Sequence, residues 1–173
     1  MRRLILFRHA KAESPDGIAD AERPLAERGR ADAARIGAYL ANQGLRPDAA
    51  VVSTARRARE TWEFAAAALR LAPPVSFDDQ LYEARAETLL EVLREIRPQT
   101  RSLMLIGHNP GMEELARALV GSEEKDARRS LAQKFPTAGL AVIDFPIDAW
   151  SEVKPGTGRL VQYVTPKTLA REK

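Results

Sequence analysis

Cysteine is absent from the 173 residues of this sequence. Disulfide bonds, thiolate metal sites and a cysteine nucleophile are therefore excluded. The sequence has only two histidines, and its apolar runs are far shorter than the roughly 20 residues that a membrane-spanning helix needs. A chain of this length fits a single domain covering residues 1–173. The lack of cysteine suits a reducing compartment, and we expect the protein to act in the cytoplasm.

The sequence is slightly basic, with a formal net charge of +3 and a pI near 9.4. A basic surface attracts anionic substrates or acidic partners. The lysines and arginines are spread along the chain without a basic block, and few aromatic residues lie between them. This distribution is not typical of nucleic-acid binding, so we expect no nucleic-acid partner and no membrane partner.

Short apolar runs alternate with longer segments of helical periodicity. The runs lack strict alternation of apolar and polar residues, which indicates strands buried on both faces. The predicted strands are residues 4–7, 49–52, 75–77, 103–106, 140–145 and 160–164, and the predicted helices are residues 27–43, 54–71, 86–96 and 110–120. This order predicts an α/β sandwich with a largely parallel sheet. We expect residues 121–129 to form an exposed excursion and residues 167–173 a frayed end.

Each of the two histidines follows a predicted strand, His9 after residues 4–7 and His108 after residues 103–106. Ligands of open α/β sheets bind beyond the carboxyl ends of the strands, so we expect both histidines at one site. After His108, Asn109 is a plausible helix N-cap and Pro110 a plausible first helical residue, which would place free N–H groups beside the imidazole and favour phosphate. The alternative is a pair of hydrogen-bonded structural histidines.

Two further charged side chains are predicted at the same edge. We expect Ser53 or Thr54 to cap the helix after the second strand, which puts Arg57 near the end where the helix dipole disfavours a cation. Arg57 has no acidic residue four positions later, which indicates an anion from elsewhere; the alternatives are Glu60 three positions later or simple solvation of the arginine. Glu83 follows the third strand, although an isolated glutamate is most often a solvated surface residue.

Arg8, His9, Arg57 and His108 together predict a site for a phosphoryl group. Two guanidinium groups match the charge of the phosphoryl oxygens and offer them bidentate hydrogen bonds. Phosphoryl transfer is catalysed mainly by positioning and charge stabilisation. We therefore expect no metal and no other cofactor.

With these residues the sequence resembles the histidine phosphatase superfamily, whose signature is an Arg-His-Gly after the first strand. Within the superfamily it most resembles the small SixA-type phosphohistidine phosphatases. The matching segments are Leu4 to Ala12, Arg23 to Ala33, Ser53 with Arg57 and Ala58, Ile106 to Leu115, and Lys134 to Leu140. Each segment alone is a weak to moderate signal, whereas their order and spacing are specific. The sequence departs from the pattern at Ala10, where glycine is usual and a positive φ would strain alanine, and at Thr54, where proline is frequent.

The resemblance implies a three-layer α/β/α sandwich with a mostly parallel sheet, like that of phosphoglycerate mutase. It implies that His9 is the nucleophile that becomes phosphorylated, that Arg8, Arg57 and His108 bind the phosphate, and that Glu83 is the proton donor. The expected activity is metal-independent removal of phosphate from phosphohistidine in a protein, such as a phosphohistidine signalling domain.

Three other functions stay open. A phosphatase for a small phosphoester, or a mutase, would use the same residues; a mutase must exclude water, and this short chain has no obvious lid, which favours hydrolysis. A non-catalytic phosphate-binding module would have little need for a nucleophile. A metal-dependent aspartyl phosphatase is poorly supported, because Asp78-Asp79 is not an Asp-x-Asp motif.

Overall fold

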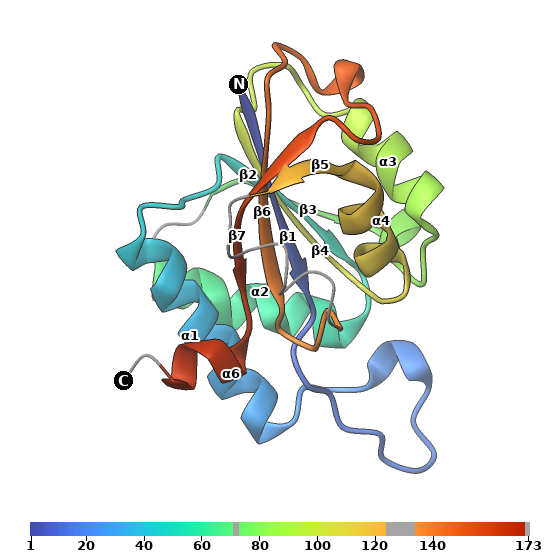
Figure 1. Cartoon of the computed structure of the whole chain (residues 1–173). Coiled ribbons are helices and arrows are strands. Elements are labelled where there is room, and N and C mark those ends of the chain that lie inside the picture. The colour runs from blue at the N-terminus through green and yellow to red at the C-terminus, as the bar shows by residue number, and fades with distance from the viewer. Residues whose placement is uncertain (71–72, 124–133, 172–173) are drawn as a thin grey trace.

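A mixed, mostly parallel sheet forms the centre of the protein (Figure 1). The computed structural model describes residues 1–70, 73–123 and 134–171. The sheet has seven strands in the order β3-β2-β4-β1-β6-β7-β5. The strands are β1 (Arg2–Arg8), β2 (Ala49–Ser53), β3 (Val75–Asp78), β4 (Ser102–Gly107), β5 (Val120–Glu123), β6 (Leu140–Phe145) and β7 (Gly158–Val164). Only β6 pairs antiparallel with its neighbours, β1 and β7, so the carboxyl ends of β1 to β4 meet at one edge.

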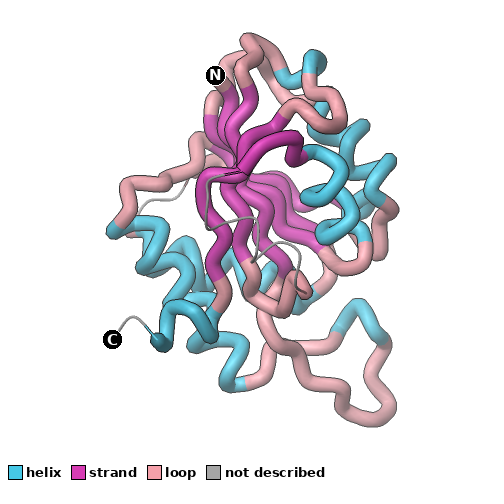
Figure 2. Tube along the Cα trace, viewed as in Figure 1, coloured by secondary structure: helices cyan, strands magenta, loops and turns pink. Residues whose placement is uncertain are grey.

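Helices cover both faces of the sheet, which confirms the predicted three-layer α/β/α arrangement (Figures 1 and 2). Helices α1 (Glu27–Asn42), α2 (Arg56–Leu69) and the short α6 (Pro166–Arg171) lie on one face. Helices α3 (Ala86–Arg94) and α4 (Gly111–Leu119) lie on the other. No described helix is both long and apolar enough to cross a membrane.

The apolar runs are continuous because the side chains of the central strands are buried in two hydrophobic cores, one on each face of the sheet. In β1, Leu4 and Leu6 belong to the core under α3 and α4, whereas Ile5 and Phe7 belong to the core under α1 and α2. The same alternation holds along β4. Side chains of successive strand residues point to opposite faces, so a strand covered on both sides needs an apolar residue at every position.

The helices that follow β2 and β4 begin later than predicted, and after β2 the expected capping groups have other partners. Helix α2 begins at Arg56 and has no side-chain cap. The Ser53 hydroxyl lies 2.7 Å from Nε2 of His108, and the Thr54 hydroxyl donates to Asp79 at 2.6 Å. Helix α4 begins at Gly111 rather than Pro110. Asn109 still acts at this end, since its Oδ1 accepts the Glu113 backbone N–H at 3.2 Å.

Two segments expected to be irregular contain secondary structure in their described parts. The expected polar excursion begins with β5, which pairs in parallel with β7; residues 124–129 of it lie outside the described residues. The expected frayed end contains α6, with residues 172–173 outside the description. Thr165 and Thr168 exchange backbone-to-hydroxyl hydrogen bonds at the start of α6, and Leu169 packs against the core. Both elements are held by tertiary partners and lack an apolar pattern of their own.

Glycine allows two close approaches that shape the layers. A Cβ at Gly37 would lie 2.3 Å from the Ala65 carbonyl oxygen, so α1 and α2 can pack at their observed separation only with glycine there. A Cβ at Gly111 would lie 2.0 Å from the Ala84 carbonyl oxygen. The start of α4 therefore lies directly against the segment that follows β3, which carries Glu83.

Candidate active site

A cavity of about 320 Å³ opens at the carboxyl ends of the parallel strands. It is lined by Arg8, His9, Lys11, Ala12, Asp20, Arg23, Arg57, Glu83, His108, Asn109 and Thr137. The fold thus brings all five predicted site residues to one cavity. Ala10 is buried beside it, and its N–H donates to the Thr61 hydroxyl at 2.9 Å. Its backbone is not among the described residues with positive φ, so alanine fits there without strain.

His9 directly follows β1, and its hydrogen bonds define which ring nitrogen carries the proton. Its backbone N–H donates to the Gly107 carbonyl at 3.1 Å, and its side chain is only 8% exposed. Nδ1 lies 2.8 Å from the Ala10 carbonyl oxygen. A carbonyl can only accept, so Nδ1 carries the imidazole proton and Nε2 keeps its lone pair. Burial, together with smaller effects of His108, Arg57 and Arg8, lowers the pKa of His9 to about 3, so the ring is neutral at physiological pH.

His108 faces His9 across the cavity, with ring centroids 5.1 Å apart. Its Nε2 contacts the Ser53 hydroxyl at 2.7 Å, and the edge of Tyr82 packs against its ring. Burial, followed by the charge of Arg57, lowers the pKa of His108 to about 4. Nδ1 of His108 is buried and has no hydrogen-bond partner among the residues that the structure describes.

Arg8 and Arg57 enter the cavity from β1 and from the first turn of α2. Arg8 donates from Nη1 to the Phe135 carbonyl at 3.1 Å, and its pKa is lowered by burial. Arg57 is 5% exposed and donates from Nη1 to the Asp20 carbonyl at 2.8 Å and from Nη2 to the Asp20 carboxylate at 3.0 Å. Within the described chain, Nε of each arginine is buried without an acceptor. Unpaired buried donors cost about 1–3 kcal/mol each, so they point to a missing anion.

Asp20 is a site residue that sequence reasoning missed. One of its carboxylate oxygens accepts hydrogen bonds from both Arg57 and the Tyr82 hydroxyl. The Tyr82 hydrogen bond is the main reason that the pKa of Asp20 lies well below its usual value. The sequence does predict that Arg57 needs an anion from outside its helix. It does not identify Asp20, because the residue lies 37 positions earlier in a segment without periodicity.

Glu83 lies at the rim of the cavity in an unusual backbone conformation. Its side chain is exposed, and its φ is +51°, in the left-handed region that non-glycine residues seldom adopt. Such a conformation persists only where the surroundings impose it. Here Tyr82 packs on His108 before Glu83, and Ala84 meets Gly111 after it. The carboxylate thus reaches the cavity while staying in contact with water.

The segment Phe135–Ala138 fixes the two histidine-bearing turns relative to each other. The Phe135 carbonyl accepts from Arg8 and, at 2.8 Å, from the Asn109 amide, while its N–H donates to Glu113 at 2.8 Å. The Ala138 N–H is shared between the carbonyls of Arg8 and His9 at 3.1 Å each. Phe135–Ala138 lies within the matching segment Lys134 to Leu140 noted in the sequence. Its hydrogen bonds hold the ends of β1 and β4 in register.

No group of three or more histidine, aspartate or glutamate side chains in the described parts of the chain lies close enough to hold a metal ion. The cavity instead combines three guanidinium groups, one lysine and two neutral imidazoles with one aspartate and one exposed glutamate. Such a set can bind a tetrahedral oxyanion and present a nitrogen lone pair to its central atom.

Comparison with known proteins agrees with this geometry. The family model of the histidine phosphatase superfamily (branch 1) matches residues 4–102. An uncharacterized protein of Mycobacterium tuberculosis is 36% identical over 163 residues, covering 93% of this chain and all of the relative. An uncharacterized chloroplastic protein of Arabidopsis thaliana is 30% identical, covering 95% of this chain and 78% of the relative.

Solved structures with a SixA-type fold also superpose on nearly the whole chain. The SixA structure from Agrobacterium tumefaciens is 35% identical and has a TM-score of 0.81, covering 95% of this chain and 98% of that one. The structure of the protein histidine phosphatase SixA complexed with tungstate is 21% identical and has a TM-score of 0.77, covering 96% and 99%. The similarity to the tungstate complex, at 21% identity, concerns the fold alone. The fold is of the phosphoglycerate mutase-like type expected from the sequence.

Proposed function

Because this chain belongs to branch 1 of the histidine phosphatase superfamily, we propose that it is a SixA-like phosphatase that removes phosphate from phosphohistidine in a protein. The observation that carries this proposal is that three side chains lining the cavity of His9 each have a buried nitrogen without a hydrogen-bond partner among the described residues: Nε of Arg8, Nε of Arg57 and Nδ1 of His108. A phosphoryl group beside Nε2 of His9 would supply acceptors for all three.

In the first step, the lone pair on Nε2 of His9 attacks phosphorus. A bond from Nε2 to phosphorus forms as the bond from phosphorus to the leaving group breaks. The Ala10 carbonyl, 2.8 Å from Nδ1, stabilises the positive charge that the ring acquires. The low pKa of His9 keeps the nucleophile unprotonated without a base.

The two arginines and His108 stabilise the phosphoryl oxygens during the transfer. The Ser53 hydroxyl already accepts the Ala55 N–H at 3.3 Å and can donate its own hydrogen to Nε2 of His108. The proton of neutral His108 then lies on Nδ1, which becomes a donor toward the phosphate. In a site this buried, fixed donors stabilise developing charge strongly.

In the second step, water attacks phospho-His9 and releases inorganic phosphate, restoring the Nε2 lone pair. Glu83 is the proposed acid in the first step and base in the second, as the carboxyl group at the rim of the cavity. An imidazole leaving group needs less protonation than an alkoxide, so Glu83 matters less for phosphohistidine than for an alkyl phosphate.

A protein substrate is favoured by the small volume of the site and by similarity to SixA. The cavity of about 320 Å³ holds a phosphoryl group with little of the molecule that carries it. The alternative is a phosphatase for a small phosphoester, which would use the same chemistry. One relative is a chloroplastic plant protein, and the cytoplasmic location of this chain stays a prediction.

Trapping the intermediate tests the central step. The protein, treated with a radiolabelled phosphate donor and quenched in alkali, should carry an acid-labile label that His9→Ala abolishes. The control Arg97→Ala, an exposed site at the opposite edge of the sheet, should label normally. Labelling of His9→Ala at the normal level would rule out His9 as the nucleophile, and loss of turnover in a chelator would rule out the metal-free mechanism.

Replacing the proton donor tests Glu83. Glu83→Gln should reduce turnover of an alkyl phosphate by about 100-fold and that of a phosphohistidine peptide by much less. Equal losses on the two substrates would count against Glu83 as the acid.

A further inference from the structure

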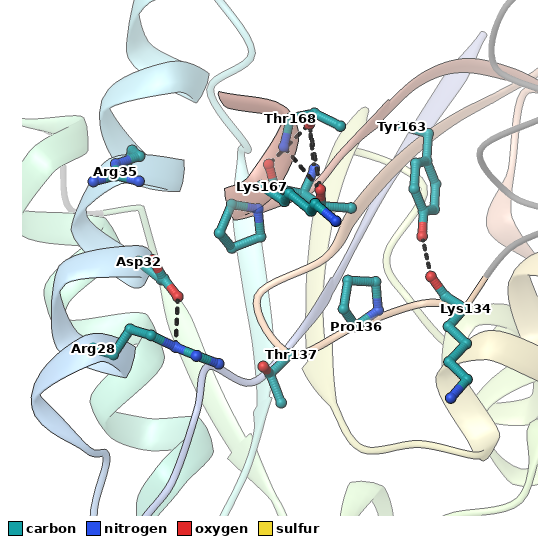
Figure 3. Close-up of a pocket in the computed structure, with 11 residues that line it drawn as sticks. Arg28, Asp32, Arg35, Lys134, Pro136, Thr137, Tyr163, Lys167 and Thr168 are labelled. Carbon is teal, nitrogen blue, oxygen red and sulfur yellow. Dashed lines mark hydrogen bonds and ion pairs between the residues drawn. The ribbon is translucent and has the colours of Figure 1, made fainter. Parts of the chain in front are cut away.

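A second, larger cavity adjoins the cavity that contains His9, which we call the phosphate cavity. Its volume is about 840 Å³, and Thr137 lines both cavities. Its walls come from α1, from the end of β7 and from α6, and its floor is formed by Pro136 and Thr137 (Figure 3). A molecule with its phosphoryl group beside His9 can therefore extend across Thr137 into this space.

The charged groups of this second cavity are mostly positive. Its lining includes Arg28, Arg35, Lys134 and Lys167, and among the described residues Asp32 is the only acidic one that lines it. The excess of three positive charges equals the formal net charge of the whole chain. In Figure 3, the Arg28 side chain extends from α1 toward Thr137, at the junction of the two cavities.

These cations are poorly compensated within the protein. Arg35, Lys134 and Lys167 have no carboxylate within 4 Å in the described part of the chain, and Arg28 approaches Asp32 only to 3.9 Å. Asp32 is 8% exposed, and its pKa is raised, chiefly by burial. Clustered like charges repel one another, so an external anion would stabilise them.

The walls that carry the cations are held in place by hydrogen bonds. The Tyr163 hydroxyl donates to the Lys134 carbonyl at 2.8 Å. Thr165 and Thr168 fix the start of α6, from which Lys167 extends. The backbone positions of the charges are thus set before any ligand arrives, which reduces the entropy lost on binding.

The cations are too widely spread for one small anion. Arg28 and Arg35 lie seven residues apart on α1, a separation of about 10 Å along the helix axis. Lys134 and Lys167 lie on two other segments across the cavity floor. Several carboxylates on a protein surface match this spread better than a single group on a metabolite.

We propose that this basic cavity binds acidic side chains of the phosphoprotein substrate, beside the phosphohistidine that enters the phosphate cavity. The inference rests on the proposed function and adds the chemistry of the partner surface. It assigns Arg28, Arg35, Lys134 and Lys167 a part in substrate selection, separate from the chemical step.

Two phosphohistidine peptides that differ only in their flanking residues test this inference. One carries glutamates around the phosphohistidine and the other carries glutamines. The matched proteins are the wild type, the double variant Arg35→Gln/Lys167→Gln, and the control Arg97→Gln/Arg101→Gln, which removes two exposed charges at the opposite edge of the sheet. An aryl phosphate without further charges reports the chemical step alone.

The wild type should have a kcat/KM about tenfold higher on the glutamate peptide at low salt, as expected for several exposed ion pairs. High salt and the cavity double variant should each abolish this preference, whereas the control variant should keep it. Turnover of the aryl phosphate should be the same in all three proteins.

Equal kcat/KM values on the two peptides, or an unchanged preference in the cavity double variant, would overturn the inference. If the control variant lost the preference for the glutamate peptide as fully as the cavity double variant, the preference would come from the net charge of the protein. That result would also overturn the inference. Preference for a small phosphoester with a second anionic group over both peptides would assign the cavity to a metabolite. If the wild type turns over neither peptides nor aryl phosphate, the proposed function itself fails.

Discussion

Lowering the pH from 7.5 to 5 is expected to destabilise the protein through its two buried histidines. In the unfolded chain both titrate near 6.5, whereas in the folded protein the pKa of His9 is lowered to about 3 and that of His108 to about 4. Below pH 6.5 the two histidines therefore bind protons in the unfolded state but stay neutral in the folded state. The free energy of unfolding therefore decreases as the pH is lowered below 6.5. The decrease ends near the pKa values of the two histidines in the folded protein.

The size of the effect follows from these values. Each histidine that stays neutral in the folded state costs about 2 kcal/mol between pH 7.5 and pH 5, or about 4 kcal/mol for the pair. His9→Gln should halve this pH-dependent loss, because only His108 then resists protonation. The carboxylates contribute equally to the pH-dependent loss of stability in the wild type and in His9→Gln, so the difference between the two proteins reports the histidine alone.

Urea unfolding at both pH values, in buffers without phosphate, measures the loss for the wild type and for His9→Gln. Titration of the imidazole signals by nuclear magnetic resonance gives the pKa values directly and should show both rings neutral at pH 5. Equal pH-dependent losses in the two proteins, together with an imidazole signal that titrates near 6.5, would refute the conclusion that His9 is buried as a neutral nucleophile.

Three further outcomes are expected. Ser53→Ala removes the hydroxyl from Nε2 of His108 and should weaken inhibition by orthovanadate about tenfold, whereas Ser53→Thr should retain it; full inhibition of the alanine variant would contradict the role of Ser53 in orienting His108. Arg57→Lys keeps the charge but loses the planar fork, so kcat/KM for an aryl phosphate should fall about 100-fold; wild-type activity would mean that charge alone suffices. Gly37→Ala should lower the free energy of unfolding by about 1–3 kcal/mol in urea, since α1 and α2 must separate there; unchanged stability would mean that the helices are not in tight contact.

Much of the candidate site could be predicted because it lies at strand ends. Arg8, His9 and His108 follow apolar runs, and parallel strands present their carboxyl ends at one edge. Arg57 could be placed because the helix after β2 begins at that same edge. Glu83 could be placed only approximately, since its conformation depends on contacts of its neighbours with His108 and Gly111.

The remaining features could not be predicted because they join segments without local patterns. Asp20 reaches Arg57 from a single 3-10 turn, Asp20–Glu22, and Val120–Glu123 become a strand only by pairing with β7. The basic cavity assembles Arg28 and Arg35 of α1 with Lys167 of α6, residues whose separation in sequence hides their proximity.

The sequence by itself therefore determined the layers, the strand ends and the residues that meet at the candidate site, because hydrophobic periodicity and strand direction are local properties that survive in any α/β sandwich. The tertiary structure alone decided which nitrogen of His9 is free, which anion holds Arg57 and where the uncompensated cations gather. Those properties depend on burial and on contacts between distant segments, and both arise only when the chain is packed.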